Sequence, residues 1–358
     1  MENAQSEKKV ELWFKEHLYL LAIIFALLSI LVLCAPIYTA KPLATGERTN
    51  IYFWNIFSGE FRLGYGVLSA VILMIVGSVL SLFHKKSPYF LSGAMLCFLV
   101  GALLFLVGKD IFNFTNSELY GYNSATDDYD LLIWSGTIKS YSAKLGAGSV
   151  IATIFAAIAA LCAFDGSYEK DTFSVRDMVE SAVLIAMAVG LNFIKLFPAP
   201  TGGSVNLQML PLMIIAFRHG PTKGFLCGGI VYGLITCLTD GYGFEFFPFD
   251  YLVGFGSVAI CGFFKNKVFP AGQKGYAVKG EIYLFIAAAL STFVRFIGGS
   301  VSSMVYYNYT FIAAITYNAA YVFISGGIAI AIIMALYGPL CRINSMFPVK
   351  EPLKEKAE

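Results

Sequence analysis

Long apolar runs alternate with short polar segments along most of the chain. Most of these runs are about 18–25 residues long, enough for a helix to cross a hydrocarbon core of about 30 Å. They lie near residues 18–36, 64–83, 89–108, 147–164, 179–197, 207–218, 223–239, 247–264, 282–306 and 310–337, the sixth being the shortest. This pattern predicts an all-α polytopic membrane protein with about ten transmembrane helices.

Composition supports a membrane protein and narrows its chemistry. The 358 residues are 58% hydrophobic and 13% charged, whereas soluble domains carry about 25% charged residues. A net charge of +2 does not indicate a nucleic-acid partner. The seven cysteines form no C-x-x-C pair and the three histidines lie outside the apolar cores, so we expect no disulfide framework, metal site or cofactor.

The distribution of basic residues predicts the orientation. Lysines precede the first apolar run, as in a signal peptide, but the run can span and no small-residue cleavage site follows it, so we expect a retained helix. Both termini are predicted to be cytoplasmic and loop 109–146 to be outside, because 17 of the 25 Lys and Arg then fall on the inner side. The other eight are Lys41, Arg48, Arg62, Lys109, Lys139, Lys144, Lys195 and Arg295.

A charged segment at 166–178 divides the chain. We expect a four-span region at 1–165, a cytoplasmic linker at 166–178, a six-span domain at 179–340 and a cytoplasmic tail at 341–358. The linker ends in Ser174-Val175-Arg176-Asp177, a capping-box pattern that predicts a helix start. No part of 1–165 places ionisable groups together at membrane depth, so the candidate chemistry lies in the six-span domain.

Asp250 is the main functional candidate. It follows Pro248 inside the apolar run 244–263, where an ionised Asp costs about 2.5–3.5 kcal/mol unless it faces a cavity, partner or ligand. The alternative is a first-turn position that favours the helix dipole, and the two can hold together. The surrounding aromatic residues favour a side chain that faces a ligand. Asp240 and Glu245 are expected in an outer loop.

Small residues and a basic turn complete the pattern of the C-terminal region. Ala182 and Ala186 are four apart on one helix face, a spacing that lets another helix approach closely. Two further pairs of glycines with the same spacing are Gly224 with Gly228 and Gly229 with Gly233. Residues 218–224 form a tight basic turn on the cytoplasmic side. In the last span, Asn318 and Tyr321 are three apart and share a face.

Residues from about 174 to 340 resemble a substrate-binding S-component of an energy-coupling factor (ECF) vitamin transporter, most closely the thiamine-specific type. The resemblance covers under half of the chain, and the four N-terminal spans are not part of that family's usual pattern. The matching motifs, in family order, are E-x-A-x-x-x-A (Glu180, Ala182, Ala186), M-L-P before an R-x-G turn (Met209, Leu210, Pro211, Arg218, Gly220), acid-Tyr (Asp250, Tyr251), R-F (Arg295, Phe296) and Y-N-x-x-Y (Tyr317, Asn318, Tyr321).

The resemblance implies a six-helix bundle in a bacterial plasma membrane that binds its vitamin at the outer face and has no catalytic residues. Thiamine combines a permanent thiazolium charge with an aminopyrimidine, which suits a carboxylate and tyrosine rings. The expected ligand-binding residues are Asp250, Tyr251, Tyr307, Asn318, Tyr321 and Tyr242. The helix of Ala182 and Ala186 would dock on a transmembrane coupling subunit driven by two separate ATPases. The chain itself has no G-x-x-x-x-G-K-[ST] phosphate loop.

Departures from the family pattern leave alternatives open. The family acid is typically Glu rather than Asp250, and the family's His, Gly, Trp and Tyr are replaced by Gly299, Ser303, Tyr307 and Ala313. The ligand could then be another vitamin or the thiamine precursor hydroxymethylpyrimidine. Arg295 is expected to hold Asp250 or a loop carbonyl, or to reach outward. An autonomous secondary transporter would need a coupling-ion site, and an intramembrane enzyme would need paired carboxylates or a Ser with a His at membrane depth.

Overall fold

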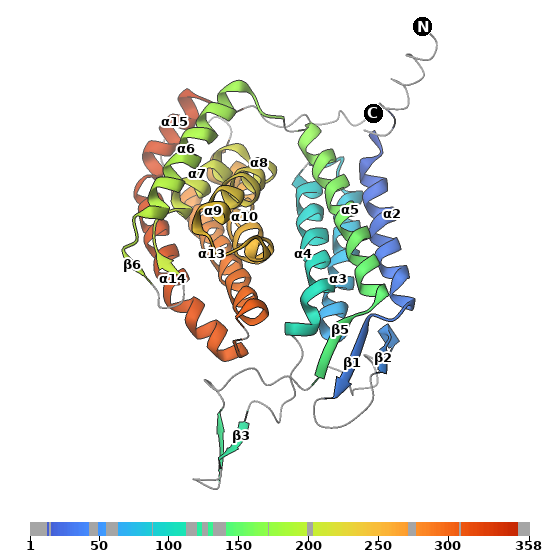
Figure 1. The fold of residues 1–358 in the computed structure, drawn as a ribbon. Coiled ribbons are helices and arrows are strands. Elements are labelled where there is room, and N and C mark those ends of the chain that lie inside the picture. The colour runs from blue at the N-terminus through green and yellow to red at the C-terminus, as the bar shows by residue number, and fades with distance from the viewer. Residues whose placement is uncertain are drawn as a thin grey trace. The chain divides into compact units, whose positions relative to one another are not determined.

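The protein forms two compact units, one built mainly from Met1–Lys170 and the other from Asp171–Tyr307 with Phe311–Pro352. The computed structural model describes residues 13, 16–42, 49–54, 64–87, 89–111, 120–123, 128–131, 141–170, 172–198, 203–270, 277–307 and 309–349. In Figure 1 the first unit runs from blue to green and the second from green to red.

Four helices make up most of the described part of the first unit. They pack side by side in Figure 1, and glycines allow close contact between them: a Cβ on Gly77 would come 2.5 Å from the ring of Phe98. The helices are α2 (Leu18–Leu31, continued by the 3-10 turn η1, Val32–Cys34), α3 (Gly64–Leu82), α4 (Tyr89–Ile111) and α5 (Ala147–Lys170).

Short strands connect these helices, which the apolar pattern does not predict. An antiparallel sheet of order β2-β1-β5 joins β1 (Tyr38–Pro42), β2 (Thr49–Ile51) and β5 (Tyr141–Leu145). A second pair, β3 (Tyr120–Asn123) and β4 (Asp128–Leu131), lies in the predicted outer loop, most of whose remaining residues fall outside the described part. Strand pairing satisfies backbone groups that no helix includes.

The second unit is a helical bundle with one small hairpin. Two of its predicted spans, 223–239 and 247–264, are continuous helical stretches at Pro221–Asp240 and Phe244–Phe263 that mix α, 3-10 and π turns. The elements are α6 (Val175–Phe193), β6 (Phe197–Pro198), β7 (Ser204–Val205), α7 (Met209–His219), α8 (Pro221–Phe225), η4 (Leu226–Tyr232), α9 (Gly233–Asp240), η5 (Phe244–Phe246), η6 (Phe247–Val253), α10 (Gly254–Gly256), α11 (Ala259–Phe263), α12 (Lys265–Val268), α13 (Val278–Tyr306), α14 (Phe311–Ala335) and α15 (Tyr337–Met346).

All ten predicted apolar runs fall in helices, so the all-α membrane fold is confirmed. Within the described residues, six helices are long and apolar enough to cross a membrane, and three shorter apolar helices match the first, second and sixth runs. The remaining run, 179–197, corresponds to α6. This helix buries a polar face (Asp177, Ser181, Asn192) and exposes apolar side chains such as Val179 and Met187.

The predicted linker 166–178 contains a short break between two helices. Helix α5 continues to Lys170 and α6 begins at Val175, so only 171–174 separate them. The capping box is confirmed: Ser174 Oγ accepts from the backbone N–H of Asp177 at 3.2 Å, and the Asp177 carboxylate accepts from that of Ser174 at 3.2 Å. Charged residues end the membrane run but not the helix, because a helix extends into water once its backbone is capped.

Glycines bring the two π-containing helices into contact, as their spacing predicts. A Cβ on Gly228 would lie 2.8 Å from the carbonyl of Phe255, and one on Gly229 would lie 2.9 Å from the carbonyl of Leu252. Because backbone atoms cannot move aside cheaply, these positions must stay without side chains for η6 to reach its place. Helix η6 is the element that carries Asp250 and Tyr251.

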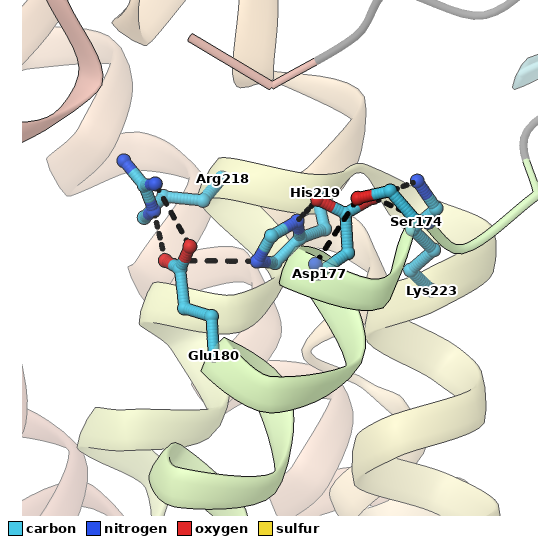
Figure 2. A network of polar contacts seen from close by, with 6 residues as sticks. All are labelled: Ser174, Asp177, Glu180, Arg218, His219 and Lys223. Carbon is cyan, nitrogen blue, oxygen red and sulfur yellow. Dashed lines mark hydrogen bonds and ion pairs between the residues drawn. The ribbon is translucent and has the colours of Figure 1, made fainter. Parts of the chain in front are cut away.

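A cluster of buried charges ties α6 to α7 and α8, as Figure 2 shows. Arg218 pairs with Glu180 through Nε and, at 2.9 Å, through Nη2, while Lys223 pairs with Asp177 at 3.1 Å. His219 lies between the two carboxylates, 3.6 Å from each. The turn at Gly220, with φ of 98°, is the predicted basic turn, but its basic side chains point into the protein and are at most 2% exposed.

Asp177 makes part of this cluster sensitive to acid. Burial alone would raise the pKa of its carboxyl, but hydrogen bonds from Lys223 and the Ser174 backbone, with the charges of Lys223 and His219, lower it below its usual value. A lowered folded-state pKa means that the carboxylate stabilises the fold above its unfolded pKa of about 4. This contribution is lost as the pH falls through the lowered pKa.

We expect Glu180→Gln to lower the thermal unfolding temperature in detergent. The substitution leaves the buried guanidinium of Arg218 without a counter-charge, a cost of about 1–3 kcal/mol. The double variant Glu180→Leu with Arg218→Leu removes both charges and should be less destabilised than Glu180→Gln, because no unpaired charge stays buried. A double variant at least as unstable as the single one would show that the pair is not what holds α6.

Candidate functional site

One cavity of about 120 Å³ lies within the second unit. The end of α6, the β7 segment, the end of α9, η6, α13 and α14 all contribute residues to its wall. Besides the predicted residues, the wall contains Asn192, Gly203, Ser204, Asn206, Gln208, Asp240, Phe255, Arg295, Gly299, Ser303, Tyr317 and Val322. The cavity therefore gathers segments that are more than a hundred residues apart in the chain.

All six residues predicted to bind a ligand line this cavity. Asn318 and Tyr251 are buried, at 1% and 5% exposure, while Tyr242 and Tyr307 are 45% and 40% exposed. The complete set is Asp250, Tyr251, Tyr307, Asn318, Tyr321 and Tyr242. The structure brings them together, and their binding of a ligand stays a prediction.

A stripe on α13 faces α14 across the cavity. Arg295, Gly299 and Ser303 are each four apart, so they lie on one face of α13. From α14, Asn318 Nδ2 donates to Ser303 Oγ at 2.8 Å and Tyr321 OH donates to Asn318 Oδ1 at 2.8 Å. A Cβ at Gly299 would lie 2.6 Å from Asn318 Oδ1, so the glycine makes room for the amide.

Asp250 reaches the same wall from the π turn η6. Its Oδ2 accepts a hydrogen bond from Ser302 Oγ at 2.7 Å. Arg295 lies over the ring of Phe255, 4.5 Å from its centroid, and is close enough to Asp250 for their charges to attract. Its Nη1 is buried, and we find no hydrogen-bond partner for it within the described residues. Arg295 thus lines the cavity rather than reaching outward, and it donates no hydrogen bond to Asp250.

A second polar chain crosses the cavity from α6 to η6. Asn206 Nδ2 donates to Asn192 Oδ1 at 3.4 Å, Asn192 Nδ2 donates to Asp240 Oδ1 at 3.2 Å, and Tyr251 OH donates to Asp240 Oδ2 at 3.2 Å. The expectation that Asp240 is only an outer-loop residue is therefore wrong. Asp240 ends α9, whereas Glu245 is not part of the cavity wall.

Sequence reasoning misses Asn192 and Asp240 for different reasons. Asn192 lies on the same buried face of α6 as Asp177 and Ser181, and its spacing from them is a signal that could have revealed it. Asp240 is eleven residues from Tyr251 in the chain, and only the folding of Gly241–Phe246 brings the two side chains together. No local pattern predicts that contact.

The hairpin of β6 and β7 is fastened to α14 beside the cavity. The backbone N–H of Gly203 donates to Tyr317 OH at 3.1 Å, and that of Asn206 donates to Ser325 Oγ at 3.3 Å. A Cβ on Gly203 would lie 2.7 Å from the ring of Tyr321. Tyr317 of the Y-N-x-x-Y motif therefore positions the segment that forms one wall.

Aromatic rings gather at the exposed part of the cavity. Tyr307 and Tyr242 both contact the ring of Phe246, with centroids 5.4 Å and 6.5 Å apart. Tyr306, another aromatic residue near the end of α13, packs on Phe246 and Phe249 and is not part of the wall. The described residues hold no group of three or more His, Cys, Asp or Glu that could bind a metal.

Comparison with known proteins finds relatives of the second unit. Residues 178–344 match the family model described as thiamine transporter protein (Thia_YuaJ). Thiamine transporter ThiT of Bacillus subtilis (strain 168) is 29% identical over 174 residues, which cover 44% of this chain and 88% of that protein. The C-terminal unit resembles thiamine transporters. The predicted resemblance to a thiamine-specific S-component is confirmed.

A solved structure, ThiT from Listeria monocytogenes, also matches part of the chain. It shares 22% sequence identity, covers 46% of this chain and 93% of that chain, and has a TM-score of 0.40. The family match begins at residue 178 and ends at residue 344, so the thiamine transporter resemblance stops short of the first unit.

We expect Gly299→Ala to destabilise the thiamine-transporter-like unit. The new methyl group would displace the Asn318 amide and its bonds to Ser303 and Tyr321, at a cost of about 1–3 kcal/mol. Thermal unfolding in detergent measures this, with Gly327→Ala on α14 as the control, since nothing lies within 4 Å of a Cβ there. Equal unfolding temperatures for the two variants would contradict the tight fit at Gly299.

Proposed function

We propose that the C-terminal unit is the thiamine-binding subunit of an ECF-type importer. The observation that carries this proposal is that all six predicted ligand-binding residues line one cavity inside the segment that matches the thiamine transporter family. The matched relative from Bacillus subtilis is described as a thiamine transporter, which supports a transport role rather than an enzymatic one.

The chemistry of the wall suits thiamine. The carboxylate of Asp250 accepts one hydrogen bond from Ser302, which leaves lone pairs for the amino group of an aminopyrimidine. Asn318 is already bonded to Ser303 and Tyr321, so it shapes the floor rather than offering free donors. The rings of Tyr242, Tyr251 and Tyr307 can hold a cation at about 0.5–2 kcal/mol each.

The outward face of α6 supports coupling to a membrane partner. Ala182 and Ala186 are exposed, as are the apolar side chains of Val183 and Met187 beside them. A partner helix can approach closely at such small residues. We propose that this face docks on the transmembrane coupling subunit, which two separate ATPases drive, and that both termini of the chain lie on the cytoplasmic side of the cell membrane.

A second candidate ligand is hydroxymethylpyrimidine, the pyrimidine half of thiamine. Gly299 and Tyr307 differ from the family pattern, and both line the cavity. A ligand without the thiazolium ring would still engage Asp250. An autonomous secondary transporter would have to hold its coupling ion at Asp240 or Asp250, the two acidic residues of the wall.

The purified wild-type protein should bind thiamine, and Asp250→Asn should weaken that binding roughly ten- to a hundredfold. The substitution removes a charge-assisted hydrogen bond worth about 1.5–3 kcal/mol. Isothermal titration calorimetry with thiamine and with hydroxymethylpyrimidine measures both affinities. The control is Glu245→Gln, which removes an exposed carboxylate outside the wall and should leave both unchanged.

The outcomes separate the candidates. Equal thiamine affinity for wild type and Asp250→Asn would remove Asp250 from the site. Binding of hydroxymethylpyrimidine without thiamine binding would move the proposal to the precursor. Binding of neither compound would overturn the thiamine-binding function.

Ala186→Trp should abolish thiamine uptake while leaving binding nearly intact. The indole would fill the exposed small-residue face of α6, which lies apart from the cavity wall. Uptake is measured in cells that also produce the coupling subunit and ATPases, and binding is measured on the purified variant. The control is Leu290→Trp, which enlarges an exposed apolar residue on α13. Normal uptake by Ala186→Trp would rule out docking at this face.

A further inference from the structure

Asp240 occupies a position that helix stability does not explain. It is the last residue of α9, and Gly241 ends the helix in the left-handed conformation with φ of 73°. A carboxylate in the last turn is unfavourable, because the C-terminal end of a helix dipole is negative. A carboxylate at position 240 therefore indicates a role other than stabilising α9.

Neutral side chains orient this carboxylate without cancelling its charge. Oδ1 accepts from Asn192 and Oδ2 accepts from Tyr251, each at 3.2 Å, and Asn206 supports Asn192. Within the part of the chain that the structure describes, we find no Lys, Arg or His that forms an ion pair with Asp240. Asp240 is thus held in the wall by neutral donors, with no basic partner among the described residues.

The charges of the wall are unbalanced. Asp240 and Asp250 are opposed by one guanidinium, that of Arg295, which attracts Asp250 and stacks on Phe255. The buried Nη1 of Arg295 has no protein acceptor among the described residues, so it is a donor that the wall offers to the cavity. One negative charge, at Asp240, is left for a cation.

We propose that Asp240 is the counter-ion for the fixed positive charge of the ligand and makes the cavity select a cation over a neutral molecule of the same shape. This rests on the proposed function and deepens it. Asp250 recognises a hydrogen-bond donor of the ligand, whereas Asp240, exposed at the cavity and bonded to the Tyr251 hydroxyl, meets the charged ring. The two carboxylates therefore have separate roles.

The test compares thiamine with its neutral carbon isostere, in which a thiophene replaces the thiazolium ring. Wild type should prefer thiamine. Asp240→Asn should lose about tenfold or more in thiamine affinity, while its affinity for the isostere changes by less than about threefold. Asp250→Asn should weaken the binding of both compounds, because both contain the aminopyrimidine ring. Glu245→Gln, an exposed acid outside the wall, should alter neither affinity.

Retained binding of the neutral isostere also shows that the Asp240→Asn variant is folded. An equal loss for both compounds would overturn the counter-ion role and leave Asp240 as a support for Tyr251. Unchanged affinity for both would remove Asp240 from recognition. In either case wild-type thiamine binding, and with it the proposed function, would stand, whereas no thiamine binding by the wild type would overturn both.

Discussion

The buried ion cluster between α6, α7 and α8 is the constraint on which the second unit depends. Helix α6 has its polar face inside and its apolar face outside, so burial of apolar surface alone does not decide which face turns inward. Two ion pairs fix the orientation of α6, because any rotation of the helix would leave buried charges unpaired. They join Glu180 to Arg218 and Asp177 to Lys223. The same helix then presents Ala186 outward along its middle and Asn192 to the cavity at its end.

Close backbone packing supplies the second constraint. The π turns η4 and η6 meet where Gly228 and Gly229 leave no room for side chains, and this contact fixes the depth at which Asp250 enters the cavity. Helix α13 fits in the same way, since a Cβ on Gly298 would lie 3.1 Å from the carbonyl of Phe249. Glycines thus place the acid-Tyr pair, while the polar residues around it complete the wall. π turns inside helices are rare and are frequently found at functional sites.

Sequence reasoning predicts what is local and misses what tertiary structure creates. The apolar runs predict the helices, and the Ser174 capping box is predicted because four consecutive residues encode it. Most of the six cavity residues are predicted through motif order in a family resemblance. Asp250 is also predicted as an acid inside an apolar run, and Tyr242 only as an aromatic candidate for a cationic ligand. Asp240 is missed because its partners come from α6 and η6, and the pairing of β1 with β5 is missed because it joins segments about a hundred residues apart. Charge predicts where the membrane segment ends, whereas the helices α5 and α6 extend into the charged segment.

The hydrogen bonds around Gly299 explain how the cavity accommodates residues that differ from the family pattern. Because Gly299 has no side chain, the Asn318 amide occupies the space. Its Nδ2 donates to Ser303 Oγ, and its Oδ1 accepts a hydrogen bond from Tyr321 OH. The floor is therefore satisfied by the protein itself. The groups of the wall that can still bind a ligand are mostly hydrogen-bond acceptors, namely the carboxylates of Asp250 and Asp240. They lie next to tyrosine rings whose faces are also electron-rich. A cavity with surplus acceptors and one surplus negative charge favours a ligand that brings donors and a positive charge, whichever residues shape its floor.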